Sequence, residues 1–307
     1  MPAQTRRFLI WTCLLMAACL LPLHLLGIDI SVSSIQIQVK YLAVAGAAFG
    51  FLLWLGRAPL VRLLLEVTIW SMLVSSLVNL PVALLVRLPV PFVDQQALLL
   101  DAKLGIDAGA WVRFAQRHPR FDFLLSLAYI SLRPVDILTL YVPILCRRPR
   151  WSSEMFVALV MQLFATVVVM AVAQGIGPWV VNGVAPTHRQ AEISELMLSF
   201  KQARAIRLDM GDIPGFVAFP SWHVMLAMLS AFTIGRLRIL RELCWIWVAL
   251  VAISTLTTGW HYGIDVLSGA LVASLSMYAS KALHRRWDAR EVRQARAAQG
   301  ASEAVLA

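Results

Sequence analysis

Long apolar segments alternate with short polar connections along the whole chain. Eight segments are apolar enough, and most are long enough, to cross a bilayer as helices: residues 8–27, 41–56, 63–86, 122–146, 154–176, 221–240, 244–259 and 262–283. The second and seventh segments are the shortest. The pattern predicts an all-α fold, a polytopic integral membrane helix bundle of about eight transmembrane helices.

Clusters of arginine and lysine fix the expected orientation of this bundle. They lie at 6–7, 57–62, 147–150, 236–241 and 281–286, and with eight crossings all five fall on one side of the membrane. That side should be the cytoplasm, because short cytoplasmic connections carry the excess of positive charge. The connections 28–40, 87–121, 177–220 and 260–261 are then extracytoplasmic. We expect the protein in the inner (plasma) membrane of a bacterium.

Composition supports this class and excludes others. Apolar residues make up 60% of the 307 positions, and mean hydropathy is +0.74. The net charge of +10 is scattered over helix ends. It therefore favours topology signals and contact with anionic head groups over a nucleic-acid partner. Arg6 and Arg7 before an apolar run resemble a signal peptide, but the run continues to Leu26, so we expect a retained span. The four cysteines predict neither a disulfide framework nor a zinc site.

Two outer connections are long enough to take part in function. Residues 94–121 mix charged and aromatic side chains in a pattern suited to a helix lying in the interface, with Trp111 and Phe114 on its apolar side. Residues 177–220 contain several glycines and prolines, so we expect much of this connection to be loop.

Two histidines carry the clearest chemistry. His223 follows Pro220-Ser221-Trp222, and His261 precedes Asp265 by four positions. Each histidine lies where a loop enters an apolar segment, so each is predicted in the first turn of a membrane helix, where ionisable groups are costly and often functional. The i, i+4 spacing places Asp265 beside His261, where a carboxylate can fix the tautomer of the imidazole and stabilise its cation.

The start of the helix that carries His223 is a candidate anion site. Pro220 suits the first helical position, and the N–H groups of Ser221, Trp222 and His223 would then be free to bind a phosphate. If both histidines converge on one phosphate, their rings should lie about 5–8 Å apart. The pattern predicts a phosphoryl-transfer centre at a membrane surface.

The Pro-Ser-x-His element followed by His-x-x-x-Asp resembles the PAP2 (type 2 phosphatidic acid phosphatase) superfamily. Trp222, in place of the usual Gly, is more similar to the inositol-phosphorylceramide-synthase-like (inositolphosphotransferase) branch. The resemblance implies that His261 is the nucleophile, that Asp265 orients it, and that His223 protonates the leaving group. It also implies no metal and no cofactor. The chain then divides into N-terminal helices with an outer interfacial segment (1–120), a PAP2-like core (121–285) and a basic cytoplasmic tail (286–307).

Two departures from the superfamily pattern concern its phosphate-binding cations. Thr255 stands at the position of the usual Arg in the third motif, and Ser126 stands at the position of the usual Lys in the first. Arg133 is retained before Pro134. The loss of two cations favours phosphodiester transfer over monoester hydrolysis, since diesters carry less charge. Arg204 and Arg207 are candidates to replace the missing charge, although they can equally lie on the outer surface, and Arg133 can equally be an interfacial anchor.

The sequence therefore predicts a membrane-embedded lipid phosphotransferase that forms a phosphohistidine. Its partners would be a phospholipid or sphingolipid phosphoester and a hydroxyl acceptor or water. The candidate site residues are His223, His261 and Asp265 for catalysis, with Arg133, Ser221, Arg204 and Arg207 for phosphate binding. A lipid or isoprenyl phosphate phosphatase is the main alternative, and metal binding by His223, His261 and Asp265 is another. A lipid transporter or non-catalytic scaffold is less consistent with spans that carry almost no charge between their ends.

Overall fold

The computed structural model describes residues 1–31, 59–202, 206–208 and 216–306, with scattered residues between 36 and 51. In chain order the elements are α1 (Ala3–Ala17), α2 (Leu20–Leu25), β1 (Ile28–Ile30), α4 (Pro59–Leu77), α5 (Asn79–Val86), α6 (Asp94–Lys103), α7 (Ala108–Arg117), α8 (Pro119–Ile130), α9 (Leu132–Leu145), α10 (Pro149–Met170), η1 (Pro178–Val180), α11 (His188–Gln202), β2 (Ile206–Leu208), α12 (Trp222–Ile234), η3 (Arg238–Leu240), α13 (Arg241–Thr257) and α14 (Gly263–Leu306).

The predicted all-α membrane bundle is confirmed. Within the described residues, six helical segments are long and apolar enough to cross a membrane: Ala3–Leu25, Pro59–Val86, Pro119–Leu145, Pro149–Met170, Arg238–Thr257 and Gly263–Ala297. The apolar helix α12 is shorter. The predicted span 41–56 falls mostly outside the described residues. The chain is an integral membrane protein.

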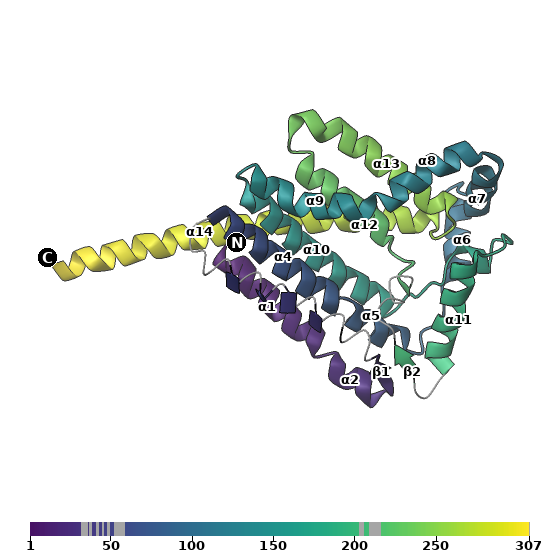
Figure 1. Ribbon diagram of the computed structural model, residues 1–307, viewed down its shortest axis with the longest axis horizontal. Helices are drawn as coiled ribbons and strands as arrows, with labels where there is room; N and C mark the ends of the chain where they lie inside the picture. Colours follow the sequence, from purple (N-terminus) through teal and green to yellow (C-terminus); the bar gives the residue numbers. More distant parts are fainter. Residues whose placement is uncertain are drawn as a thin grey trace.

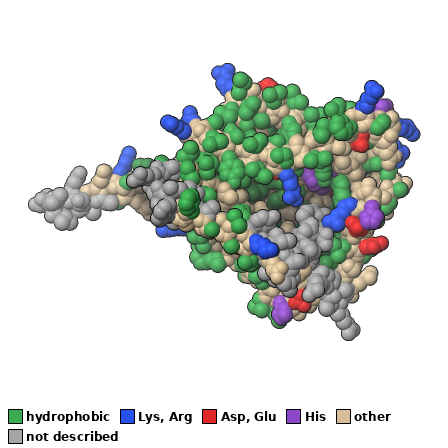
Figure 2. Space-filling model, viewed as in Figure 1, with side chains coloured by type: hydrophobic (Ala, Val, Ile, Leu, Met, Phe, Trp, Pro, Cys, Tyr) green, Lys and Arg blue, Asp and Glu red, His purple; other side chains and the backbone are tan. Residues whose placement is uncertain are grey.

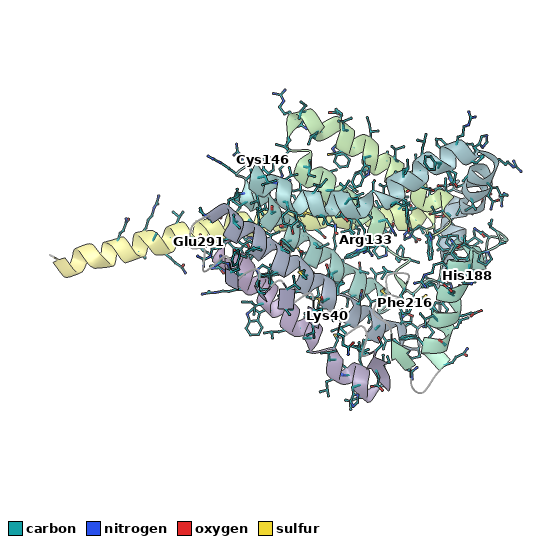
Figure 3. The ribbon with its side chains drawn as sticks, viewed as in Figure 1. Lys40, Arg133, Cys146, His188, Phe216 and Glu291 are labelled. Atoms are coloured by element: carbon teal, nitrogen blue, oxygen red, sulfur yellow. The ribbon has the colours of Figure 1, made fainter. Side chains whose placement is uncertain are left out.

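The long helices lie roughly side by side along one direction, and both termini lie at the same end of the bundle (Figure 1). Helices α6, α7 and α11 gather at the opposite end, near a small parallel sheet in which β1 pairs with β2. In Figure 3, Cys146 and Glu291 mark the end that holds the termini, whereas His188 and Phe216 mark the other. The bundle therefore has two distinct ends.

Apolar side chains both fill the bundle and cover its flanks. Around α12 the core contains Val224, Met228, Val251 and Ala273, which come from α12, α13 and α14. On the outside of α8, Leu124, Leu127 and Ile130 are exposed. Figure 2 shows a largely hydrophobic surface over the upper helices, with Lys and Arg side chains towards its two ends. Such a flank suits contact with lipid chains, because a soluble protein rarely exposes so large an apolar area.

The outer connections differ in part from expectation. The segment 94–121 forms α6 and α7, and α7 is strongly amphipathic, with Trp111 half-buried and Phe114 exposed. We expected much of the connection 177–220 to be loop, and part of it forms α11 (His188–Gln202). The glycines and prolines that suggested a loop lie outside this stretch, which contains neither. Nothing in its own composition therefore prevents a helix.

Candidate active site

The ends of α12 and α14 that lie nearest α6 meet at one point. Helix α12 packs against α9, α13 and α14. A Cβ atom on Gly269 of α14 would lie 2.7 Å from the carbonyl oxygen of Ser221, so a larger side chain here would push the two helices apart. The backbone N–H of Ser221 also donates to the carbonyl of Asp265 at 3.0 Å. Close packing thus fixes the start of α12 against the first turns of α14.

Ser221 is the N-cap of α12. Its backbone is extended, with φ −63° and ψ 109°, and its side chain accepts a hydrogen bond from the N–H of Val224 at 3.4 Å. The prediction that Pro220 opens the helix is wrong, because serine is a strong N-cap and the helix begins only after it, at Trp222. The expectation that the N–H of Ser221 is free to bind an anion is also wrong, since Asp265 accepts it.

His261 lies just before α14 and not within it, which corrects the prediction that it belongs to the first turn. Helix α13 ends at Thr257, and Gly259 has a φ of 74°, a left-handed conformation that glycine adopts readily. The chain then turns through Trp260 and His261 before α14 begins at Gly263. This turn leaves His261 buried, with only 2% of its surface exposed.

The two histidine rings are in direct contact. Nδ1 of His223 lies 3.2 Å from Nε2 of His261, and the ring centroids are 5.4 Å apart. The centroid separation lies in the range expected for rings that converge on one phosphate. A phosphate between the two nitrogens would therefore replace their mutual hydrogen bond. On its other side the His223 ring stacks against Tyr129 of α8, with centroids 4.4 Å apart and planes inclined by 27°.

The surroundings of His261 determine which nitrogen carries the proton. Nδ1 lies 2.8 Å from the carbonyl oxygen of Ala218, which can only accept, so Nδ1 is the protonated nitrogen. Nε2 therefore keeps its lone pair and faces His223. Burial lowers the pKa of His261 to about 4, against a smaller opposing effect of the Ala218 hydrogen bond. The ring is thus neutral at neutral pH, the state that a nucleophile requires.

Asp265 contacts His261 less directly than the spacing predicted. Its Oδ2 lies 3.4 Å from Nδ1 of His261, further than the Ala218 oxygen, and it accepts the N–H of Tyr262 at 2.8 Å. Within the described structure Oδ1 has no hydrogen-bond partner, although it is buried. Asp265 thus caps the start of α14 and places a carboxylate beside the imidazole, while the backbone of Ala218 fixes the tautomer.

Two carboxylates that the sequence did not identify as site residues hold this region together. Asp101 of α6 accepts the N–H groups of Gly263 and Ile264, each at 2.7 Å, and so caps α14. Asp94 accepts the N–H groups of Ile176 and Gly177, at 3.1 and 2.9 Å, and the hydroxyl of Tyr262 at 3.1 Å. Burial raises the pKa of both carboxyl groups, and these hydrogen bonds partly oppose that effect.

The signal that could have identified Asp101 is its position directly after Leu98, Leu99 and Leu100. An acid that follows an apolar run within a helix needs a partner when it is buried. Its first partner, the N–H of Gly263, lies 162 positions further along the chain. Only the fold shows which backbone groups pair with Asp101.

The predicted phosphate-binding cations are placed differently from one another. Arg133, on α9, is close enough to interact electrostatically with His223. It lies near the centre of the molecule in Figure 3, and Figure 2 shows a Lys or Arg side chain beside a His side chain in the central hollow of this face. Arg204 lies outside the described residues. The backbone of Arg207 belongs to β2 and pairs with Asp29, but its side chain lies outside the described part.

Neither residue at the two departing motif positions can supply positive charge. Thr255 is buried, and its hydroxyl donates to the carbonyl of Ala252 at 2.7 Å. Ser126 is half-buried on α8. Within the described residues no group of three or more His, Cys, Asp and Glu side chains could hold a metal ion. The chemistry available here is a buried neutral imidazole beside a second imidazole, with one arginine close by.

A comparison with protein-family models decides the family. The model described as the PAP2 superfamily matches residues 95–279, which is more than half of the chain. The chain belongs to the PAP2 superfamily. The match contains both histidine motifs and also α6 and α7, which precede the predicted start of the core at residue 121. No curated protein and no solved structure matches the chain.

Proposed function

We propose that this PAP2 superfamily member is a membrane-embedded lipid phosphotransferase that works through a phosphohistidine. The observation that carries the proposal is the contact between His223 and His261 at 3.2 Å, with the proton of His261 held on Nδ1 by Ala218. This arrangement directs a neutral Nε2 lone pair towards the place where a phosphorus atom would replace the hydrogen bond. An activated nucleophile beside an acid–base partner is the usual geometry of covalent catalysis.

The first step forms a bond between Nε2 of His261 and phosphorus and breaks the bond from phosphorus to the leaving oxygen. His223, protonated beside the anionic substrate, gives its proton to that oxygen. Asp265 stabilises the positive charge that develops on the imidazole of His261, and Arg133 stabilises the non-bridging oxygens. Arg204, Arg207 and the backbone N–H groups that follow Ser221 are further candidates for this role.

In the second step the oxygen of an acceptor hydroxyl attacks phosphorus and the bond to His261 breaks. His223 takes the proton of the acceptor, which restores both imidazoles. If the acceptor is a lipid hydroxyl the product is a new phosphodiester, and if it is water the product is a free phosphoryl compound. The choice of acceptor therefore separates a transferase from a phosphatase.

We further propose that the substrates are phosphodiesters of phospholipids or sphingolipids, as in an inositolphosphotransferase. Ser126 and Thr255 provide no charge where the superfamily usually has Lys and Arg. A monoester dianion would be poorly neutralised by Arg133 alone, because each extra negative charge that is buried needs its own partner. Under the same proposal the site faces the extracytoplasmic side, and the positive clusters of the predicted cytoplasmic connections support this orientation.

The test is lipid profiling of membranes incubated with the purified protein, with His261→Ala protein as the matched control. We expect a new phospholipid species that depends on His261 when phosphatidylinositol and ceramide are both supplied. Release of free phosphate from phosphatidic acid, without a new phosphodiester, would instead establish the phosphatase alternative. If neither product exceeds that of the His261→Ala control, the proposal is wrong.

A further inference from the structure

A basic pocket lies at the other end of the bundle from the histidines. It has a volume of about 460 Å³ and is lined by Arg150, Trp151, Glu154, Arg236, Lys281 and Arg285. Four cationic side chains thus face one carboxylate. They come from α10, from the connection after α12 and from α14, so the tertiary fold brings them together.

Glu154 holds two of the four cations in fixed positions. Its side chain is 6% exposed and accepts hydrogen bonds from Arg150 at 2.9 Å and from Arg236 at 2.6 Å. The guanidinium of Arg236 also lies 5.2 Å from the centre of the Trp151 ring. Because one carboxylate pairs with two guanidinium groups, positive charge remains in excess. The arginines are preorganised, and their remaining N–H groups need not be ordered again when an anion binds.

Lys281 and Arg285 leave the pocket further from neutrality. They are four positions apart on α14 and so lie on the same side of the helix, where two like charges are unfavourable. Within the described part of the chain neither forms an ion pair. Asp288 lies nearby on α14, but it pairs with Arg150. An anion in the pocket would therefore remove a repulsion as well as form new hydrogen bonds.

An apolar stripe on α14 leads towards this charge. Leu271, Leu275 and Tyr278 are 60%, 58% and 71% exposed, and their spacing places them on the side of the helix that Arg285 continues. At 1.5 Å per residue, Lys281 lies about 24 Å along the helix from Asp265, close to the thickness of a hydrocarbon core. The pocket is then at the head-group level of the opposite leaflet, with a surface for acyl chains beside it.

We infer that this pocket binds the phosphate group of an anionic membrane phospholipid. A free phosphate carries the same anionic group, but it has no acyl chains that could contact the exposed stripe on α14. The lipid places its phosphate among Arg236, Lys281 and Arg285 and its chains along Leu271, Leu275 and Tyr278. This inference does not depend on the proposed reaction, because the pocket lies near the middle of α14, about 24 Å along the helix from its start, where the histidines lie.

The experiment measures lipid binding to the full chain in detergent, by native mass spectrometry with phosphatidylglycerol and phosphatidylcholine as probes. We expect phosphatidylglycerol to bind in preference to phosphatidylcholine. The double substitution Lys281→Gln and Arg285→Gln should weaken the binding of phosphatidylglycerol about 30-fold, since each cation near a membrane surface contributes about a factor of five. The charge-conserving pair Lys281→Arg and Arg285→Lys should bind like wild type, which excludes a folding defect.

The matched control is Arg290→Gln with Arg293→Gln, which removes two charges from the same helix outside the pocket and should leave binding unchanged. Equal weakening in this control would mean that net charge alone attracts the lipid, and it would overturn the inference. Equal binding of both probes would overturn it as well. Displacement of phosphatidylglycerol by submillimolar inorganic phosphate would identify a site for free anions instead of lipid.

Discussion

Substitution of Asp265 by Asn tests how the candidate nucleophile is supported. The side chain keeps its size, and its oxygen can still accept the N–H of Tyr262. The backbone of Ala218 still fixes the proton of His261 on Nδ1. The substitution therefore removes only the negative charge that an ionised Asp265 places beside the imidazole, and it should not change the tautomer.

The size of the effect follows from the distance of 3.4 Å between Asp265 and His261. Two full charges at this separation interact by about 5 kcal/mol at an effective dielectric constant of ~20. If half a charge has developed on the imidazole in the transition state, about 2.4 kcal/mol is lost. The rate should then fall by roughly 50- to 100-fold. This loss is smaller than the ~10⁴-fold loss in a triad whose carboxylate alone sets the tautomer.

The assay is single-turnover formation of the phosphoenzyme, quenched in base, because phosphohistidine is stable there and labile in acid. Asp107→Asn is the matched control. Asp107 is an exposed N-cap of α7, and Asn is an equally good cap, so its rate should stay at the wild-type value. A loss of 10⁴-fold in Asp265→Asn would refute the role assigned to Ala218. A change of less than threefold would show that the carboxylate does not stabilise charge on His261.

Four further predictions follow from the same geometry. His261→Ala should abolish both turnover and the phosphoenzyme, and activity that survives in this variant would exclude a phosphohistidine at His261. His223→Ala should still form the phosphoenzyme from a substrate with a good leaving group. The pKa of His261 falls from 6.5 to about 4 on folding, so the unfolded chain binds the proton at a higher pH than the folded chain. The free energy of unfolding should therefore decrease as pH falls from 6.5 to about 4. Thermal unfolding should show a smaller decrease in His261→Asn, and an equal one would assign the pH effect to other groups. Arg133→Gln should raise KM for a phosphoester about tenfold with a smaller change in kcat, and an unchanged KM would place Arg133 away from the substrate. Asp101→Ala should lower the free energy of unfolding by about 2–4 kcal/mol through loss of two buried hydrogen bonds, and a thermal shift no larger than that of Asp107→Ala would contradict its role as the cap of α14.

Periodicity and charge were sufficient to predict the class of fold. Helices that cross a membrane must be long and apolar, so a span such as 154–176 can be read directly and corresponds to α10 (Pro149–Met170). Helix α12 shows the limit of this reading. The apolar run 221–240 contains Gly235, whose Cβ would lie 2.4 Å from the carbonyl of Ala231, and the helix ends at Ile234. A hydropathy pattern does not reveal such a stop.

The residue types of the site could be predicted from the sequence, but their hydrogen-bond partners could not. His223 and His261 were predicted to converge, and they do so because α12 and α14 pack closely at Gly269. The spacing of His261 and Asp265 suggested a direct hydrogen bond. A helix rule, however, holds only inside a helix, and His261 lies outside one. The group that accepts the hydrogen bond from Nδ1 is a backbone carbonyl. Every residue has one, so the sequence does not distinguish it.

The same reason explains why α6 was assigned to the membrane interface and not to the site. Asp94 and Asp101 are seven positions apart on one helix, so they lie on the same side of α6 and face the start of α14 together. Asp101 fixes the first N–H groups of α14, and Asp94 fixes Tyr262, the residue between His261 and that helix. The position of the candidate nucleophile is therefore set from outside the two histidine motifs. This agrees with a family match that begins at residue 95, within α6, well before either motif.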